Sequence, residues 1–277
     1  MGGLGNVLFQ INYAHNLKDR GFDVALNVYL LRENFITKKL LGWSIHDTHS
    51  SLMALDLISS FELEDKISIF FFFGLLSKYV RKRIFNCQFF GLISPDCKKL
   101  KVTHLFGYFH IKNPINSGFI AIAKRAIEKR LDHPDSKCVK ENLRQIGSSW
   151  VIHIRGGDYK LDQNFSLNSD YYIKAINDEN NFYVVTNDQE FSKKALSELN
   201  LKFNFVASNS ALDDFIIITL SRKKIISNST FSWWAAEIGS ENSLIIQPDP
   251  FFKHLNWQPM TTKNRQNIKS QPISNRN

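Results

Sequence analysis

The chain has 277 residues, of which 43% are hydrophobic and 13% aromatic, so it can bury a substantial core, and its 22% of charged residues exclude a disordered composition. The formal charge of +9 is compatible with nucleic acid, an anionic membrane surface or a phosphorylated substrate, and does not choose among them. The three cysteines, Cys87, Cys97 and Cys138, are odd in number and form no Cys-x-x-Cys pair, which disfavours a disulfide framework or a structural zinc site and favours a reducing cytoplasm.

The chain opens on a glycine-rich segment, Gly2-Gly3-Leu4-Gly5-Asn6, which we expect to be a loop. A helical pattern follows up to Gly21, and residues 22–28 have the composition of a strand. Glycines before a helix let backbone N–H groups approach an anion, although a plain tight turn also explains the segment. Such a loop normally follows a strand, so we expect the first strand of this domain to be missing or to lie upstream.

Residues 30–145 show no regular alternation, and we assign 1–145 to a first domain. Its most apolar run, residues 67–76, is far shorter than the roughly 20 residues that a membrane-spanning helix needs. A buried helix or strand is the favoured interpretation. The alternative is that the run and the basic cluster after it rest together on a membrane surface. The N-terminus shows no signal-peptide pattern.

From Ser148 the pattern becomes regular. Strands are predicted at 150–154, 182–186, 203–206, 224–227 and 244–247, the last ended by Pro248, and helices at 170–176, 189–199, 212–220 and 231–238. This alternation indicates a parallel sheet covered by helices, which binds ligands at the carboxyl ends of its strands. We assign residues 146–262 to a second domain and 263–277 to a polar, basic tail.

The first of these strands delivers a cluster of functional side chains. His153 and Arg155 alternate along it and point to one face, two glycines follow, and Asp158 comes next. An arginine grips a phosphate with two parallel hydrogen bonds, and Asp158 is placed to hold that guanidinium. An arginine after a strand is more often a surface ion pair, but the three residues together favour a site.

A second polar cluster, Ser227-Asn228-Ser229-Thr230, lies between a predicted strand and the helix that begins at Phe231. Ser229 or Thr230 is a candidate N-cap, which explains one hydroxyl and leaves the others unexplained. A helix start rich in hydroxyls is also a phosphate cradle. The tryptophans that follow, at 233 and 234, are predicted to be core residues.

The pair Asp213-Asp214 opens another predicted helix. Carboxylates in a first turn favour the helix dipole, so capping is the default interpretation. An acidic side chain also accepts hydrogen bonds from the N1–H and amino group of guanine, and this alternative stays open.

Together these segments resemble the bacterial α-1,2-fucosyltransferases of glycosyltransferase family 11. That family carries Gly-Gly-Leu-Gly-Asn-Gln near its start, His-Ile-Arg-Arg-Gly-Asp-Tyr in the middle and Asn-Ser-Thr-Phe-Ser-Trp-Trp-Ala-Ala towards the end. The order and spacing match here from about residue 2 to 260, and the third motif is nearly complete. The segments 106–109 and 170–172 are also similar.

The resemblance implies an α/β fold of the GT-B type, with two Rossmann-like domains facing across a cleft. The first carries the acceptor side, and the second binds GDP-fucose. The implied donor-binding residues are His153 near the guanosine, Arg155 on the diphosphate, Asp158 at the turn and Asp214 on guanine. Asn228, Ser229, Thr230 and Ser232 are implied around the phosphates, and Gly3 and Gly5 as further residues that bind GDP-fucose. Arg155 and Asn6 are implied at the reaction centre.

The implied reaction is inverting transfer of L-fucose from GDP-β-L-fucose to a hydroxyl of a glycan, expected to be O-2 of galactose. It would form an α-1,2-fucoside during synthesis of a surface polysaccharide or O-antigen. We find no Asp-x-Asp in the chain and expect no metal or other cofactor. The sequence does not identify the catalytic base, and His15 and the carboxylates of the first domain are the candidates. A lipid-linked acceptor, a cytoplasmic location and peripheral contact with the inner membrane fit this activity.

Three departures from the family pattern stand out. The second arginine of the central motif is Gly156, the glutamine after Asn6 is Val7, and the strand before the first loop is missing. They motivate an alternative, a degenerate transferase that only binds nucleotide or glycan. A nucleic-acid-binding protein is a remote alternative, because the chain has no helix-turn-helix, zinc or RNA-binding signature.

Overall fold

The computed structural model describes residues 3–28, 48–64, 87–93, 104–157, 167, 169–176, 181–199, 201–252 and 259–269. It is an α/β structure, and the strand pairs that it describes are all parallel. The chain divides into two compact units, Met1–Ala126 and Ile127–Asn277. From the sequence we predicted this boundary at residue 145, which is nineteen residues after Ala126. Residue 145 lies inside the helix Lys137–Ile146, one residue before its end.

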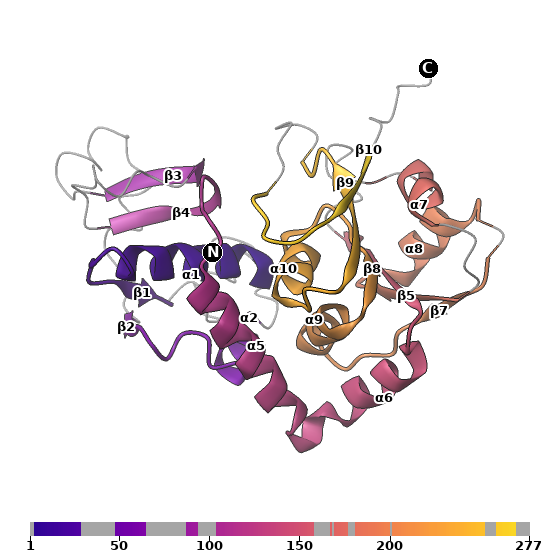
Figure 1. Ribbon diagram of the computed structural model, residues 1–277, viewed down its shortest axis with the longest axis horizontal. Helices are drawn as coiled ribbons and strands as arrows, with labels where there is room; N and C mark the ends of the chain where they lie inside the picture. The colour runs from indigo at the N-terminus through magenta and orange to yellow at the C-terminus, as the bar shows by residue number, and fades with distance from the viewer. Residues whose placement is uncertain are drawn as a thin grey trace. The chain divides into compact units, whose positions relative to one another are not determined.

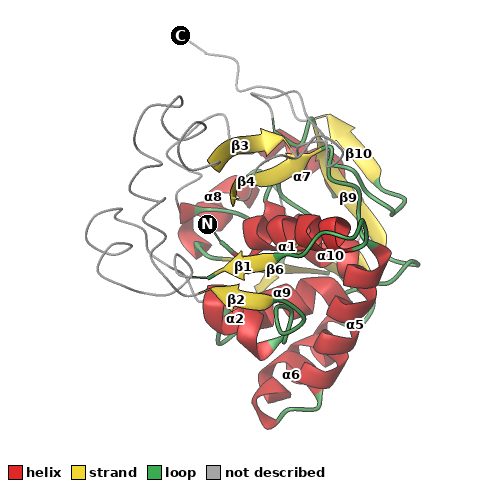
Figure 2. Cartoon of the chain, turned by 90° about the vertical axis from the view of Figure 1, so that its left-hand side faces the viewer, coloured by secondary structure: helices red, strands yellow, loops and turns green. Residues whose placement is uncertain are grey.

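The first unit holds two pairs of parallel strands, β1 with β2 and β3 with β4. Helix α1 lies between the two pairs (Figures 1 and 2) and contacts both β4 and α2. The bounds are α1 Leu4–Lys18, β1 Ala25–Asn27, α2 Thr48–Ala54, β2 Glu62–Glu64, β3 Cys87–Ile93, β4 His104–Ile111 and α5 Ser117–Leu131. Helix α5 crosses from the first unit into the second.

Helix α1 begins earlier than the sequence suggested. Gly3 is its N-cap residue and Leu4 its first helical residue, so the predicted glycine-rich loop over residues 2–6 is wrong in extent. Leu4 and Leu8 are both buried and lie on one face of the helix, and this apolar contact favours helical structure from the first turn. Gly5 is consequently a buried helical residue rather than part of an open loop.

The second unit contains one six-stranded parallel sheet. Its elements are η4 Pro134–Ser136, α6 Lys137–Ile146, β5 Trp150–Ile154, α7 Ser169–Ala175, β6 Phe182–Thr186, α8 Gln189–Leu196, β7 Phe203–Phe205, α9 Ala211–Leu220, β8 Lys223–Ile225, α10 Thr230–Ile238, β9 Leu244–Asp249 and β10 Gln266–Lys269. The predicted alternation of strands and helices over residues 150–247 is confirmed.

The strands of this sheet lie in the order β7-β6-β5-β8-β9-β10. Numbered from β5 as the first, this is the order 3-2-1-4-5-6 of a nucleotide-binding Rossmann fold. The chain reverses its direction of travel across the sheet between β5 and β8, which are direct neighbours. In such sheets the crevice at this switch point, beyond the carboxyl ends of the strands, is where a nucleotide binds.

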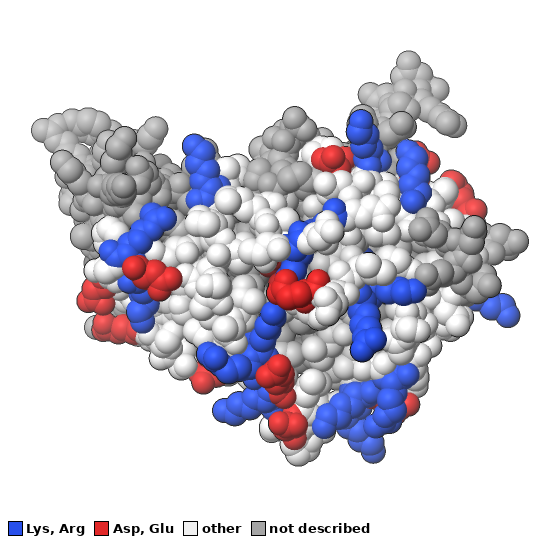
Figure 3. All heavy atoms as spheres, viewed as in Figure 1, with Lys and Arg blue, Asp and Glu red and all other residues white. Residues whose placement is uncertain are grey.

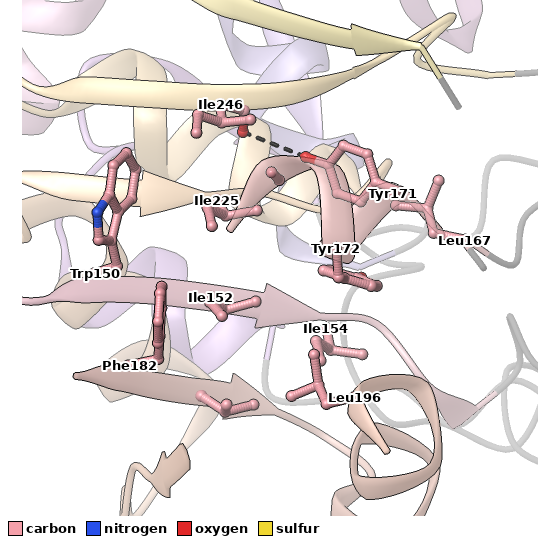
Figure 4. Packing of buried hydrophobic residues seen from close by; sticks show 12 residues of the cluster. Trp150, Ile152, Ile154, Leu167, Tyr171, Tyr172, Phe182, Leu196, Ile225 and Ile246 are labelled. Atoms are coloured by element: carbon pink, nitrogen blue, oxygen red, sulfur yellow. Dashed lines mark hydrogen bonds between the residues drawn. The ribbon is translucent and has the colours of Figure 1, made fainter. Parts of the chain in front are cut away.

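The two faces of the sheet are covered by different helices (Figure 1). Trp150, Ile152 and Ile154 of β5 point to the face on which Tyr171 and Tyr172 of α7 pack (Figure 4). The intervening residues of β5 point to the other face, where α9 and α10 lie. All five residues of β5 are buried, as expected for a central strand of a parallel sheet.

The C-terminal part of the sheet differs from the prediction. Strand β9 continues through Pro248 to Asp249, and residues 266–269, which we had placed in a polar tail, form the edge strand β10 beside it. A buried ion pair between Arg265 and Glu237 of α10, with 2.5 Å between Nη2 and Oε2, ties this edge to the unit. Because this contact is made by charged side chains, the pattern of apolar residues in the sequence did not predict that β10 belongs to the sheet.

Lysine and arginine side chains are interspersed with acidic ones on the face shown in Figure 3. On α6, for example, exposed Lys137, Lys140 and Arg144 surround Glu141, which pairs with Arg144. None of the helices in the described ranges has both the length and the apolar character required to cross a membrane. The apolar run 67–76 and the basic residues Lys78, Arg81, Lys82 and Arg83 lie outside the described residues.

Candidate nucleotide-binding site

His153, near the end of β5, and Ser227, just after β8, meet across the switch point of the sheet. The Nδ1 atom of His153 lies 2.9 Å from Oγ of Ser227, and both side chains are buried. The two residues are 74 positions apart in the chain, and the parallel pairing of β5 with β8 brings them together. This contact joins the two sequence motifs that we expected to form one site.

Burial lowers the pKa of His153 to about 3, and the nearby charge of Arg155 lowers it further in the same direction. The imidazole is therefore neutral at physiological pH. A neutral ring supports the Ser227 loop through its hydrogen bond but supplies no positive charge to a phosphate. The cation of this motif is Arg155, the first residue after β5, whose side chain is partly exposed.

Arg155 stands at the carboxyl edge of the sheet, where β5 gives way to Gly156 and Gly157. Gly157 has φ of +62°, a left-handed conformation that favours glycine, and it turns the chain away from the strand. Asp158, the third member of the predicted cluster, lies outside the described residues. Its expected support of the Arg155 guanidinium therefore stays a prediction.

Helix α10 starts directly beyond β8 with Ser229 as its N-cap residue. Within the described part of the chain, the Ser229 side chain makes no capping hydrogen bond, whereas Asp188 caps α8 and Ser210 caps α9. The N-cap position predicted for Ser229 is thus confirmed, but within that part of the chain its hydroxyl does not act as a capping acceptor. Since the N–H groups of a first helical turn have no partner inside the helix, this helix start presents donors and a positive dipole end at the switch point.

The remaining polar residues of this segment are buried. Asn228 and Thr230 flank Ser229, and the hydroxyl of Ser232 donates to the Ser229 carbonyl oxygen at 3.3 Å. The predicted burial of Trp233 and Trp234 is confirmed, since both side chains are fully inaccessible. The tryptophans thus anchor α10 in the unit, and the hydroxyl-rich segment before them lines its start.

The two aspartates at the start of α9 have different environments. Asp213 is buried, and its Oδ2 accepts a hydrogen bond of 3.2 Å from the backbone N–H of Asn209, which is a local capping role. Asp214 is partly exposed, and desolvation raises its pKa to about 6. A hydrogen bond from Ser208 opposes that rise, and the charge of Asp213 adds to it. Asp214 is thus the member of the pair available to a ligand.

Two phenylalanines connect Asp214 to the rest of the site. The ring of Phe231 in α10 lies 5.7 Å from the ring of His153 and 5.3 Å from that of Phe215, the neighbour of Asp214. The starts of α9 and α10 are therefore packed together beside the end of β5. Sequence reasoning missed Phe231 as a site residue, although its position inside the third motif was a usable signal.

Tyr171 of α7 is a second residue that sequence reasoning did not assign to the site. Its hydroxyl donates a 2.7 Å hydrogen bond to the carbonyl oxygen of Ile226, immediately before Ser227. The same hydroxyl lies 3.4 Å from the carbonyl oxygen of Ile246 in β9 (Figure 4). A buried tyrosine reaching two backbone carbonyls fixes where the chain leaves β8.

The predicted residues of the N-terminal motif belong to the first unit. Gly3 is exposed at the start of α1, Gly5 is buried in its first turn, and Asn6 is partly exposed. His15, the candidate base, is buried between the rings of Phe61 at 4.8 Å and Phe119 at 5.4 Å. Burial lowers the pKa of His15. A ring enclosed in this way is poorly placed to contact an acceptor hydroxyl.

Across the described residues, no three His, Cys, Asp or Glu side chains come together as metal ligands would. The groups at the switch point are instead one guanidinium, a neutral imidazole, hydroxyls, a carboxylate and a helix start. The donors of this set suit an anionic ligand, and the carboxylate, which accepts hydrogen bonds, suits a base that carries N–H groups.

A family model described as "Glycosyl transferase family 11" matches residues 2–254 of the chain. The O-antigen biosynthesis glycosyltransferase WbnK of Escherichia coli is 25% identical over 296 aligned positions, which cover 94% of this chain and 96% of that protein. An α-1,2-colitosyltransferase, also of Escherichia coli, is 27% identical over 134 positions, which cover 43% of this chain and 46% of that protein.

Proposed function

Since the chain belongs to glycosyltransferase family 11, we propose that it transfers L-fucose from GDP-β-L-fucose to a glycan hydroxyl with inversion, forming an α-1,2-fucoside. The observation that carries this proposal is the meeting of two motifs at one switch point. Arg155 follows β5, and the hydroxyl-rich start of α10 follows β8, the neighbouring strand. A nucleoside diphosphate placed there would have a guanidinium on one side and helix donors on the other.

We assign the nucleobase from the hydrogen-bonding groups that it must match. Guanine offers an N1–H and an amino group side by side, and an ionised carboxylate accepts from both. Asp214 is a partly exposed carboxylate at the start of α9, linked to His153 through the rings of Phe215 and Phe231. This placement supports GDP as the nucleotide of the donor.

The reaction would be a single in-line displacement at C1 of the sugar. The acceptor hydroxyl attacks C1, the bond from C1 to the β-phosphate oxygen breaks, and the departing GDP takes up the negative charge. Arg155 and the donors at the start of α10 would stabilise that charge without a metal or other cofactor. The base that removes the acceptor proton is not assigned, and Asn6, from its place in the family's first motif, would orient the acceptor or the donor.

The donor sugar has a second candidate. The relative named α-1,2-colitosyltransferase handles, by its name, colitose rather than fucose with the same linkage. A GDP-linked colitose would place the same diphosphate on the same residues, so Arg155, Asp214 and the start of α10 do not separate the two sugars. The two donors must therefore be compared directly.

The proposal for the acceptor substrate is based on the family and on the relative that is named for O-antigen biosynthesis. We propose a galactose-containing, lipid-linked glycan of a surface polysaccharide as acceptor, and synthesis at the cytoplasmic face of the inner membrane. The proposed architecture is of the GT-B type, with acceptor and donor on different Rossmann-like domains. The alternating parallel strands and helices of the second unit support the donor half of that architecture.

A degenerate transferase that binds nucleotide without turnover is the second candidate function, favoured by Gly156 at the place of the family's second arginine. The two functions separate in one assay. The purified chain is incubated with GDP-fucose or GDP-colitose and a panel of galactosides, and products are analysed by mass spectrometry and linkage NMR. We expect an α-1,2-linked product from one donor. GDP binding without transfer or donor hydrolysis would instead establish the binding module.

A further inference from the structure

The residues that follow β5 and β6 lie next to each other at the carboxyl edge of the sheet. The two strands pair in register up to Ile154 beside Thr186, so Arg155 and Asn187 leave the sheet as neighbours. The Oδ1 atom of Asn187 accepts a 3.0 Å hydrogen bond from the backbone N–H of Gly156. Because a backbone N–H only donates, this bond fixes which end of the amide is oxygen and which end, Nδ2, is the donor.

Glycines make this close approach possible. A Cβ atom at Gly156 would lie 2.5 Å from Cβ of Asp188, and one at Gly157 would lie 2.9 Å from Nδ2 of Asn187. The loop after β6 therefore packs directly on the Gly156-Gly157 turn. An arginine at position 156, as in the family pattern, would require this loop to move, and the departure at Gly156 is thus coupled to the position of Asn187.

The loop that carries Asn187 is held by its neighbours. Oγ1 of Thr186 accepts hydrogen bonds from the N–H of Asp188 at 3.0 Å and from the hydroxyl of Ser192 at 2.8 Å. The Asp188 carboxylate caps α8 through a 3.0 Å bond from the N–H of Phe191. Asn187 itself is exposed, and its Nδ2 makes no hydrogen bond to any residue that the structure describes.

Building on the proposed transferase function, we propose that Asn187 binds the donor directly, with Nδ2 donating a hydrogen bond to a diphosphate oxygen beside Arg155. Its side chain is oriented in advance by the bond to Gly156, so little entropy is lost when the ligand arrives. An amide donor next to the guanidinium supplies part of the interaction that a second cation would otherwise make. The ligand class is a nucleoside diphosphate.

Two substitutions separate direct binding from support of the turn. Asn187→Asp keeps an oxygen that accepts from the Gly156 N–H but loses the Nδ2 donor and adds negative charge. Asn187→Ala loses both the acceptor and the donor. If Nδ2 binds phosphate, GDP affinity should fall about tenfold in the alanine variant and further in the aspartate variant, as expected for a hydrogen bond to a charged group. If Asn187 only holds the turn, the aspartate variant should bind GDP nearly as well as the wild type.

The measurement is titration calorimetry of the full chain with GDP and with guanosine, which lacks phosphates. We expect weaker GDP binding and unchanged guanosine binding in both variants. Asn181→Asp, an exposed change at the opposite end of β6, controls for the added charge and should leave GDP binding unchanged. GDP affinity of the aspartate variant equal to that of the wild type, or a parallel loss of guanosine binding, would overturn the assignment of Asn187. A wild-type chain that binds neither ligand would remove the proposed function and this inference together.

Discussion

The hydroxyl of Tyr171 donates a 2.7 Å hydrogen bond to the carbonyl oxygen of Ile226, at the point where the chain leaves β8 for the proposed phosphate-binding segment. The N–H of Ile226 still bonds to the carbonyl oxygen of Ile246, so this residue is held on both sides. Ser227, which meets His153, comes next. Tyr171 thus positions the site without contacting the proposed ligand.

Tyr171→Phe should therefore weaken donor binding while preserving the fold. Losing one buried hydrogen bond costs about 1 kcal/mol of unfolding free energy, and the freed carbonyl would let the Ser227 segment shift. We expect a raised KM for the sugar nucleotide, measured by steady-state kinetics, together with a modest loss in thermal stability. Tyr172→Phe, its buried neighbour in α7, is the matched control. Equal changes in KM for both variants would contradict a specific role for Tyr171.

Arg155→Ala should lower the rate of transfer severely. The fold should stay intact, because Arg155 lies beyond the last residue of β5 and is partly exposed. Losing one fixed donor to the charge that develops on the leaving group costs ~3 kcal/mol in barrier, or about a hundredfold in kcat. Arg155→Lys should recover only part of the rate, since lysine lacks the two-pronged geometry. Circular dichroism checks the fold, and near-normal turnover of the alanine variant would exclude Arg155 from the reaction.

GDP affinity should depend on pH through Asp214. Burial raises the pKa of this carboxyl to about 6, and only the ionised form accepts hydrogen bonds from guanine. Affinity should therefore be constant well above pH 6 and decline as the pH falls through that value. Calorimetry of GDP binding between pH 5 and 8 measures the profile.

Asp214→Asn should flatten that profile and lower GDP affinity, since the amide has only one acceptor oxygen and cannot be ionised. The amide NH₂ of the variant would complement the extra carbonyl of xanthine, so its preference should shift from GDP towards xanthosine diphosphate. Unchanged discrimination between the two nucleotides would show that Asp214 does not contact the base.

Transfer should be insensitive to EDTA. In the proposed reaction, Arg155 and the donors at the start of α10 stabilise the negative charge on the departing diphosphate. Removing divalent metals should therefore leave kcat unchanged. The assay compares initial rates before and after dialysis against EDTA, with and without added magnesium or manganese. A strong loss that either metal restores would replace this scheme with a metal-assisted one.

Lys224 in β8 should make folding stability depend on pH. Its side chain is fully buried, and desolvation, reinforced by the charges of Arg265 and Lys263, lowers its pKa to about 7. In the unfolded chain the pKa is near its ordinary 10.5, so between about pH 7 and 10.5 the unfolded state binds more protons. The contribution of this group therefore raises stability with rising pH across that interval, and it is constant below about pH 7.

Lys224→Met should remove that contribution and stabilise the protein most at or below neutral pH, where burying the charge is most costly. Nζ of Lys224 donates to the carbonyl oxygen of Thr219, so part of the gain is offset by the loss of that bond. Urea unfolding at several pH values, for the wild type and the variant, measures the difference. Parallel pH profiles would contradict the assignment to Lys224.

Local patterns in the sequence determined where most elements of the second unit lie. The strands at 150–154 and 182–186 have the predicted bounds, because runs of β-branched and aromatic residues and the turn residues around them act over short distances. The same local reading identified the motifs that contain Arg155 and Ser229. It also identified the pair Asp213-Asp214, from which the resemblance to family 11 selected Asp214, but neither could show which of the two aspartates is exposed.

The tertiary structure alone decided which motifs meet. The strand order places β5 beside β8, and this pairing brings His153 to Ser227 across 74 positions. Packing also set the start of α1 at Leu4 and added β10 through the buried pair of Arg265 and Glu237. The reason is that strand order, burial and hydrogen-bond partners depend on contacts between distant segments, and such contacts have no period along the chain.

Gly156 shows most clearly the difference between what the sequence determined and what the tertiary structure decided. In the sequence it is only a missing arginine, whereas in the fold it is the surface on which Asp188 and Asn187 pack. Its meaning depends on a loop 31 positions away that arrives by way of the neighbouring strand. The sequence thus determined the chemistry available to the site. The sheet decided which of those groups lie together, because parallel pairing brings the carboxyl ends of neighbouring strands to one edge.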